Sequence, residues 1–290
     1  MDTATFLVQC LNAVQYGLLL FLVASGLTLI FGIMGVINLA HGSFYMLGAY
    51  MAFALAPVFG DAFLLRLLAG VVLAAVFGYL LEWAFFSFLY QRDHLQQVLM
   101  TYALILVFEE LRSIFVGNDV HGVPIPPWLA GGFSLGGLME YPWYRVFASL
   151  ACLVVAVALY VVVNRTRLGM MIRAGASNRD MVRGLGVDIR QLYRVVFAGG
   201  VALAALAGMI AAPLSSVYPG MGGSILIICF VVVVIGGIGS ITGALIASLL
   251  VGFVDTFGKV FFAQASGIGV YLLMAIVLIW RPEGLARRGH

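Results

Sequence analysis

The chain has 290 residues, of which 63% are hydrophobic and only 9% are charged, with a formal net charge of +3. An average soluble domain carries about 25% charged residues, and a soluble globule of this size could not bury so much apolar surface. Since a membrane span needs about 20 apolar residues, the composition excludes a soluble protein and predicts an all-α polytopic membrane protein.

The apolar runs follow one another along the whole chain, with few polar interruptions. A loop rich in glycine and proline follows the fourth run and covers residues 117–142, and a polar stretch follows the fifth run and covers residues 164–194. The predicted runs cover residues 6–31, 34–59, 64–90, 98–116, 146–163, 195–214, 225–235, 241–257 and 268–280. These segments predict a bundle of about nine transmembrane helices, with eight to ten as the range, and with glycine-broken segments among them.

The basic residues predict the orientation of the bundle. The stretch 164–194 contains seven of the fifteen lysines and arginines, whereas the loop 117–142 contains none. Because cytoplasmic loops carry an excess of Lys and Arg, we expect 164–194 to be cytoplasmic and 117–142 to be extracytoplasmic. Five crossings before the basic stretch place the N-terminus outside. The C-terminus, with Arg281, Arg287 and Arg288, is also expected in the cytoplasm. The chain must then cross the membrane an even number of times after the basic stretch, and ending one span and beginning the next at 236–240 gives four crossings.

Two glycine-rich segments resemble each other in spacing. The segment 32–35 followed by Gly42 is similar to 236–239 followed by Gly243. Paired glycine-interrupted segments in two halves of a chain are typical of a substrate path in transporters. A stripe of small and polar residues at helical spacing, ending at Ala49, predicts the wall of that path or, as the alternative, a tight seam between helices. The candidate path residues are Gly35, Asn38, His41, Gly42, Tyr45, Gly236, Gly237, Gly239 and Ser240.

Charged residues inside the apolar runs are few. Glu109 and Arg112 at i, i+3 favour a local ion pair over a proton relay, and Asp255 could pair with Lys259 at i, i+4. Glu82 has no partner that the sequence identifies. With so few carboxylates in the spans, an ion-coupled carrier is disfavoured.

The chain contains no pattern of catalytic groups, no metal-binding cluster and no phosphate-binding loop. His41 has no second candidate metal ligand near it. We therefore expect a protein that is not an enzyme and that carries neither a metal nor a cofactor. If its transport is active, the energy source lies on another chain.

The basic stretch contains the signals of a short helix. The run Ser177-Asn178-Arg179-Asp180 can cap a helix start, and Gly184 and Gly186 can end it. A short helix across the cytoplasmic face is a docking element for a partner protein. The alternative is an ordinary basic loop with one helical turn.

Several ordered motifs add a resemblance to a known family. The four motifs are the segment 32–50, the set 167–169, 173–174 and 184–186 within the basic stretch, the segment 236–244 and the segment 281–284. In these motifs the chain resembles bacterial branched-chain amino-acid ABC importer permeases of the Liv type. The first motif is more similar to the smaller of the two paired permeases. In one departure, Ala174 is followed by Gly175 where many importer permeases place an acidic residue.

The resemblance implies a function and a set of partners. It implies a single transmembrane permease domain over residues 1–290, which moves branched-chain or related amino acids across the bacterial inner membrane. The partners would be a second homologous permease, two cytoplasmic ATPase subunits that bind ATP and Mg, and an extracytoplasmic binding protein that could touch the loop 117–142; no nucleic acid is expected. The stretch 164–194 would be the coupling loop, and its candidate contact residues are Arg173, Ala174, Gly175, Asn178, Arg179, Asp180, Arg183, Gly184 and Gly186.

Two alternatives from other classes remain open at the level of sequence. One is an ion-coupled secondary transporter, which would transport by itself under an ion gradient. The other is a passive channel for a small neutral solute such as urea or an amide. The sequence also leaves open which amino acid is carried, and whether the pore has its own substrate-binding site.

Overall fold

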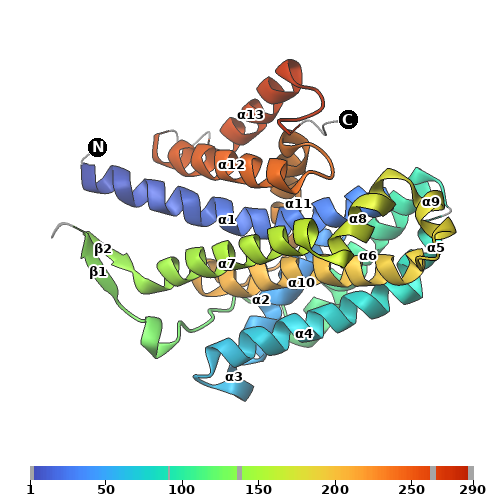
Figure 1. The fold of residues 1–290 in the computed structure, drawn as a ribbon. Helices are drawn as coiled ribbons and strands as arrows, with labels where there is room; N and C mark the ends of the chain where they lie inside the picture. The colour runs from blue at the N-terminus through green and yellow to red at the C-terminus, as the bar shows by residue number, and fades with distance from the viewer. Residues whose placement is uncertain (1–2, 91, 136–138, 262–265, 287–290) are drawn as a thin grey trace.

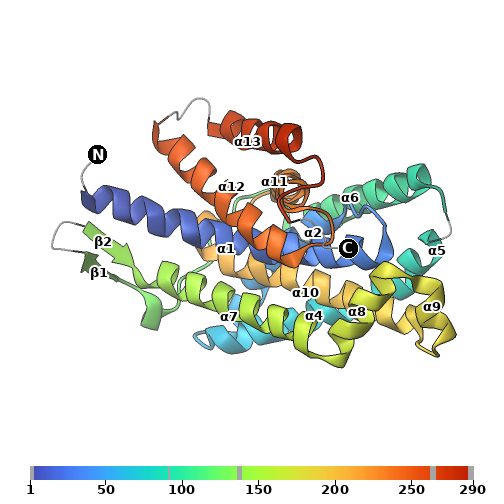
Figure 2. The ribbon, with the colours of Figure 1, turned by 45° about the horizontal axis from the view of Figure 1, so that its top comes forward.

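A computed structural model describes residues 3–90, 92–135, 139–261 and 266–286 of the chain. Within these residues the protein is a bundle of helices with one short hairpin. In both views the long helices α1, α4, α7 and α10 run along the length of the molecule, α12 lies against α1, and α13 lies beyond α12 (Figures 1 and 2). The predicted basic residues Arg287 and Arg288 lie outside the described residues.

The elements follow the apolar runs closely, and most helices extend a few residues beyond the predicted ends. Between α4 and α5 the helix continues through a π-helical turn, Glu82–Phe86. The helices are α1 (Thr3–Met34), α2 (His41–Ala54), α3 (Ala56–Phe59), α4 (Phe63–Leu81), α5 (Ser87–Leu89), α6 (His94–Val116), α7 (Trp143–Arg165), α8 (Arg167–Ser177), α9 (Arg179–Gly184), α10 (Ile189–Ser215), α11 (Met221–Gly236), α12 (Ile241–Phe261) and α13 (Ser266–Trp280), and the strands are β1 (Gly132–Leu135) and β2 (Met139–Pro142).

Several helices are long and apolar enough to cross a membrane. Five segments of the described chain meet this criterion: α1, the continuous run Phe63–Leu89, α7, α10 and α12. The helix α11 is apolar but shorter. The structure is therefore an all-α polytopic membrane protein, and the figure of nine crossings stays a prediction.

Burial divides the long helices into central and peripheral ones. Most of α1 and α10 is buried inside the protein, whereas α4 and α7 expose most of their apolar side chains. A helix that is apolar on all sides is buried in protein or faces lipid. We therefore assign α1 and α10 to the centre of the bundle and α4 and α7 to its lipid-facing surface.

Glycines allow the central helices to approach one another closely. A Cβ atom added to Gly26 of α1 would lie 2.6 Å from the carbonyl oxygen of Gly200 in α10, and one added to Gly200 would lie 2.7 Å from the side chain of Ile30. Small residues at such crossings let backbones pack directly, which is how membrane helices gain contact.

The chain breaks where one continuous span, 34–59, was predicted, so that prediction was wrong. Helix α1 ends at Met34, Gly35 takes a positive φ of 67°, and helix returns only at His41. The side chain of Asn38 stabilises the turn, because its Oδ1 accepts a hydrogen bond from the Ala40 N–H at 3.0 Å. Gly35 and Asn38 therefore do not share a helix face with Tyr45, as the spacing had predicted.

The predicted break at 236–240 is confirmed. Helix α11 ends at Gly236, Gly237 and Gly239 have φ of 91° and 79°, and α12 begins at Ile241. The C-terminal segment covers this end, because the Leu285 N–H donates to the Ile235 carbonyl at 2.8 Å. This contact satisfies a carbonyl that a helix end leaves without a partner.

The two glycine-rich breaks are neighbours in space. A Cβ atom added to Gly32, near the end of α1, would lie 3.2 Å from the Cα atom of Gly239. The similarity of spacing noted in the sequence therefore corresponds to two interrupted segments that meet.

The polar stretch 164–194 contains two short helices instead of one. The predicted cap of α9 is confirmed, because Asn178 Oδ1 accepts from the Met181 N–H at 3.0 Å, and Gly186 follows the helix with φ of 87°. Helix α8 was not predicted. It is capped by Thr166, whose Oγ1 accepts from the Gly169 N–H at 3.2 Å. Asp188 caps α10 in the same manner.

The bundle has two different ends (Figure 1). At one end, the antiparallel strands β1 and β2 lie near the start of α1; we call this the hairpin end. At the opposite end lie α5, α8 and α9, with the arginines of 164–194; we call this the arginine end. The loop before the hairpin is joined to the α10–α11 connection by paired backbone hydrogen bonds between His121 and Val217, at 2.9 and 2.8 Å.

Candidate translocation cavity and coupling surface

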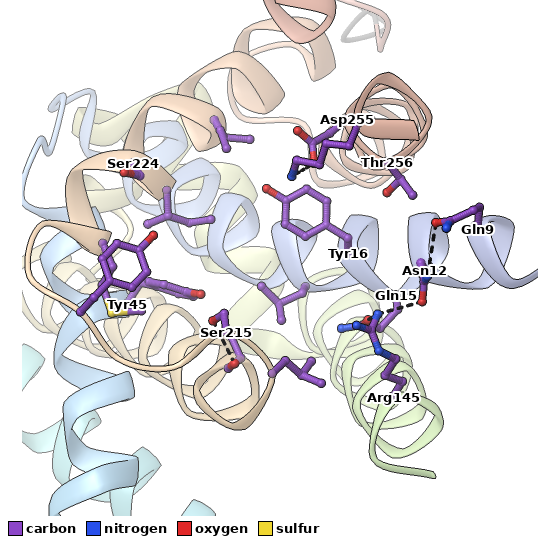
Figure 3. Close-up of a pocket in the computed structure, with 18 of the residues that line it drawn as sticks. Gln9, Asn12, Gln15, Tyr16, Tyr45, Arg145, Ser215, Ser224, Asp255 and Thr256 are labelled. Atoms are coloured by element: carbon purple, nitrogen blue, oxygen red, sulfur yellow. Dashed lines mark hydrogen bonds and ion pairs between the residues drawn. The ribbon is translucent and has the colours of Figure 1, made fainter. Parts of the chain in front are cut away.

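A cavity of about 580 Å³ lies among α1, α2, α7, α10, α11 and α12 (Figure 3). Its wall combines polar side chains with apolar ones. The polar and charged lining residues are Gln9, Asn12, Gln15, Tyr16, Tyr45, Arg145, Ser215, Tyr218, Ser224, Asp255, Thr256 and Lys259, and the apolar ones include Leu19, Leu214, Met221, Ile225 and Ile228. A mixed wall of this kind is typical of a site for a small polar solute with an apolar part.

The predicted pair of Asp255 and Lys259 is confirmed and forms part of the cavity wall. Lys259 Nζ lies 2.5 Å from Asp255 Oδ2. The Asp255 side chain is only 11% exposed, whereas that of Lys259 is 60% exposed. The ammonium group also lies 5.4 Å from the centroid of the Tyr16 ring. The aspartate is therefore held in the wall, and the lysine presents its charge to the cavity.

Another part of the wall carries a second cation. Arg145, near the start of α7, donates from Nη1 to Asn12 Oδ1 at 2.8 Å and to Gln15 Oε1 at 3.4 Å. Asn12 in turn donates to Gln9 Oε1 at 3.3 Å. In Figure 3 this row of polar side chains on α1 lies on one side of Tyr16, and Tyr45 lies on the other side. The hydrogen bonds fix the position of the guanidinium at the wall.

These groups give the cavity a definite chemistry. It contains one carboxylate, from Asp255, and two cations, from Arg145 and Lys259, next to apolar side chains. A zwitterionic solute with an apolar side chain has the complementary groups. Charged residues in membrane segments are costly and commonly line a substrate pathway.

Of the predicted path residues, Tyr45 lines this cavity. Asn38 and His41 are instead fully buried, and His41 Nε2 lies 2.9 Å from the carbonyl oxygen of Val23 in α1. Gly42 packs against the Gly222 backbone of α11. For these three residues the geometry matches the alternative of a tight helix seam.

The second break contains the other predicted path residues, Gly236, Gly237, Gly239 and Ser240. None of them is among the residues that line the cavity. Their positive φ angles and the hydrogen bond from the Gly243 N–H to Ser240 Oγ, at 3.1 Å, shape the connection between α11 and α12. Their part in a translocation path stays a prediction.

Sequence reasoning missed most of the polar wall. Gln9, Asn12 and Gln15 recur every three residues within the first apolar run, and a polar row in an otherwise apolar helix is a signal that could have been used. Arg145 gave no such signal, because its partners lie on α1, far away in the sequence.

The short helix α9 presents an exposed surface at the arginine end. Val182 is buried against the bundle, whereas Met181 is 68% exposed and Leu185 is 79% exposed. Asp180 and Arg183 are exposed beside them. An apolar tip with charges around it is the composition of a protein-docking surface.

Two arginines attach the basic stretch to the ends of membrane helices. Arg179 donates from Nη2 to the Met34 carbonyl at 2.9 Å, at the point where α1 ends. Arg173 donates from Nη1 to the carbonyl of Val163 near the end of α7. Cations stabilise helix C-termini because the last carbonyls there are unpaired and carry partial negative charge.

The other predicted coupling residues differ in exposure. Ala174, Gly184 and Gly186 are exposed. Gly175 is buried, and a Cβ atom there would lie 3.4 Å from Ile33 and 3.6 Å from Leu192. The absence of a side chain thus lets α8 approach α1 and α10.

Two further acidic side chains of the membrane helices have partners within the chain. Glu109 and Arg112 form the predicted pair at 3.1 Å, and Arg112 also donates to the Gly117 carbonyl at 2.6 Å. The partners of Glu82 are Tyr90, whose hydroxyl donates at 2.7 Å, and Arg194, whose Nε lies at 3.4 Å. Among the described residues no group of three or more His, Cys, Asp or Glu side chains could hold a metal ion.

Comparison with known protein families gives one match over almost the whole chain. The family model described as "Branched-chain amino acid transport system / permease component" matches residues 9–280.

Curated proteins with similar sequences carry related descriptions. The chain is 30% identical to the high-affinity branched-chain amino acid transport system permease protein BraD of Pseudomonas aeruginosa, over 98% of this chain and 96% of that protein. It is 27% identical to the permease protein LivH of the corresponding system in Escherichia coli, again over 98% and 96%. It is also 27% identical to the permease protein LivM of Escherichia coli, over 90% of this chain and 66% of that protein.

Proposed function

The chain belongs to the family of branched-chain amino acid transport system permease components, and we propose from this premise that it carries branched-chain or related amino acids across the inner membrane as the LivH-type subunit of an ABC importer. The observation that carries this proposal is the family match over residues 9–280. The chain itself is a permease and not an enzyme.

The cavity supports the proposed substrate class. An amino acid at neutral pH has a carboxylate and an ammonium group, and leucine, isoleucine and valine add an apolar side chain. Arg145 and Lys259 offer cations for the carboxylate, Asp255 offers an anion for the ammonium group, and the apolar wall suits the side chain. We propose that the cavity is a step on the path of the substrate.

The arginine end supports docking of an ATPase subunit. The exposed tip of α9, with Met181 and Leu185, is the proposed contact, and the stretch 164–194 is the proposed coupling loop. The hydrogen bond from Arg179 to the Met34 carbonyl offers a route by which movement of α9 would reach the break between α1 and α2. ATP and Mg would be bound by the ATPase subunits, with none on this chain.

The hairpin end supports a different contact. The loop 117–142 holds the α10–α11 connection through His121 and Val217, and Tyr218 beside Val217 lines the cavity. An extracytoplasmic binding protein that docks on this loop would be next to the cavity. Together with a second homologous permease and two ATPase subunits, it would complete the importer.

The arginine distribution supports the proposed orientation. With the arginine end in the cytoplasm, the N-terminus and the hairpin lie outside and the C-terminus lies inside, with nine crossings. The hairpin and α9 lie at opposite ends of the bundle, as this orientation requires (Figure 1).

Uptake in the cell of origin tests the proposed function. A strain in which this chain is deleted should lose saturable uptake of radiolabelled leucine, isoleucine or valine, and the chain supplied from a plasmid should restore it. A tagged copy that restores uptake should also co-purify with ATPase subunits. Unchanged uptake of all three amino acids would overturn the proposed substrate, and restored uptake by a chain without ATPase partners would overturn the proposed class.

A further inference from the structure

A second cavity, of about 930 Å³, lies at the arginine end and is separate from the cavity of Figure 3. It is bordered by the π-helical turn Glu82–Phe86, by α5, by the connection to α6 and by the start of α10. Three arginines, Arg92, Arg190 and Arg194, face it together with a single carboxylate, Glu82.

The charges of this second cavity do not cancel. The Glu82 carboxylate is buried and already has two partners, the Tyr90 hydroxyl at 2.7 Å and Arg194 Nε at 3.4 Å. Among the described residues no ion pair joins the side chain of Arg92 or Arg190 to a carboxylate. The cavity therefore has an excess of positive charge that the chain itself does not neutralise.

The apolar side of the second cavity is exposed on a candidate membrane-spanning segment. Trp83 and Phe88, which line the cavity, are 58% and 70% exposed. Both belong to the membrane-spanning run Phe63–Leu89, near the end at which the arginines begin. Aromatic side chains at such a boundary are typical of the level of the lipid headgroups.

We propose that the second cavity binds the headgroup of an anionic phospholipid, with the phosphate between Arg190, Arg92 and Arg194 and an acyl chain along Trp83 and Phe88. Arginine forms paired, charge-assisted hydrogen bonds with phosphate oxygens. Basic pockets between membrane helices bind anionic headgroups for this reason.

A lipid fits this surface better than a protein does. A docking protein would have to cover Trp83 and Phe88, which are exposed on the spanning run Phe63–Leu89, whereas an acyl chain of the surrounding bilayer suits such a face. A free phosphate would use the arginines and leave the aromatic side chains without a role. The inference depends on the membrane location of the chain and is independent of the transported substrate.

Fluorescence quenching tests the proposal on the complex purified through a tag on this chain. The complex is placed in nanodiscs of phosphatidylcholine that contain rising fractions of phosphatidylglycerol with brominated acyl chains. The signal of Trp83 is the difference between the unmodified protein and the Trp83→Phe variant. Quenching of this signal should saturate at low fractions of phosphatidylglycerol. Brominated phosphatidylcholine should require at least about a tenfold higher fraction, because its choline cation leaves the headgroup with no net charge for the three arginines to attract.

Matched variants assign the effect to the second cavity. In the double variant Arg92→Gln/Arg190→Gln, which leaves the Glu82–Arg194 pair intact, the preference for the anionic lipid should disappear. The variant Arg165→Gln/Arg167→Gln removes the same charge at the same end, outside this cavity, and should keep the preference.

Three results would overturn the proposal. These are equal quenching by both lipids in the unmodified protein, an equal loss of preference in both double variants, and a preference that inorganic phosphate abolishes at millimolar concentration. If the Arg92→Gln/Arg190→Gln protein does not fold, the single Arg190→Gln variant, which changes an exposed side chain, is measured in its place.

Discussion

Asp255 and Lys259 differ in the environment of their charges, although they form one ion pair. The carboxylate is nearly buried, and the ammonium group faces the cavity. Such a pair has two possible roles: it can hold α12 in place, or it can contact the solute. Removing one charge alone does not separate these roles, because breaking a buried pair destabilises the fold.

Neutralising both members of the pair separates the two roles. We expect Lys259→Gln to lower amino-acid uptake by about tenfold or more, because a lost hydrogen bond to a charged group costs about 1.5–3 kcal/mol. The double variant Asp255→Asn/Lys259→Gln should regain stability and still transport poorly. Uptake and thermal stability in detergent are the two measurements.

The pair of Glu109 and Arg112 supplies the control, because it lies outside the cavity. Glu109→Gln/Arg112→Gln should leave the KM of uptake unchanged. Full recovery of uptake by the double variant at 255 and 259 would show that the cavity pair has a structural role alone.

Neighbouring glycines on α10 allow a test of close packing. Gly200 packs against Ile30 and Gly26, whereas a Cβ atom at Gly199 would meet nothing within 4 Å. We expect Gly200→Ala to destabilise the protein by about 1–3 kcal/mol through overpacking. Gly199→Ala should be neutral or stabilise it by up to about 1 kcal/mol, because alanine is the better helix former.

Thermal unfolding of the two glycine variants in the same detergent measures the difference. A lower melting temperature for Gly199→Ala than for Gly200→Ala would contradict the packing of α1 against α10.

At the scale of elements, α9 and the break after α1 form one connected unit. Arg179 is held at the Met34 carbonyl, and a Cβ atom at Gly35 would lie 2.8 Å from its Nη2. A change in the position of α9 would therefore displace the end of α1, which lies next to the second break at Gly239. Arg179 acts in this account as a positioning residue.

Loss of this connection should uncouple the importer. We expect Arg179→Ala to leave ATP hydrolysis by the complex within about twofold, and to lower uptake per ATP by about tenfold, since the lost hydrogen bond involves a charged donor. Arg179→Lys, which keeps a donor and a charge, should restore part of the ratio. The ratio of uptake to ATP hydrolysis in proteoliposomes is the measurement.

Arg167→Ala, at the start of α8, is the control for charge at this end. An unchanged ratio in Arg179→Ala, or the same fall in Arg167→Ala, would rule out a specific role for Arg179.

The sequence was most informative where structure depends on local signals. Asn178 and the glycines of 236–240 act on their immediate neighbours, so the cap of α9 and the second break could be predicted. The first break was predicted only in part. The glycines of 32–35 indicated an interrupted segment, but the next span was placed from residue 34 because an apolar run continues through residues 35–40, and the turn there depends on Asn38 and Gly35 together. The cavity could not be predicted. Its wall depends on which faces of α1, α7 and α12 meet, and no local signal in the sequence specifies that packing.

For the whole molecule, the account requires that the hairpin end and the arginine end lie on opposite sides of the membrane. Single cysteines at Glu140 and at Arg183, in a chain whose native Cys10, Cys152 and Cys229 are replaced by alanine, can report this. A membrane-impermeant maleimide should label the cysteine at 140 in right-side-out vesicles and the cysteine at 183 only after permeabilisation. The opposite pattern would reverse the proposed orientation and with it the assignment of the coupling surface.

The central claim is that this chain moves amino acids with energy supplied by other subunits. The most direct measurement is leucine uptake by proteoliposomes that contain the complex purified through this chain, with its binding protein added, in the presence of ATP or of a proton or sodium gradient. The account predicts uptake with ATP at the ATPase side and none with either gradient alone. If proteoliposomes that contain this chain without its partners take up leucine under a proton or sodium gradient, the central claim is contradicted.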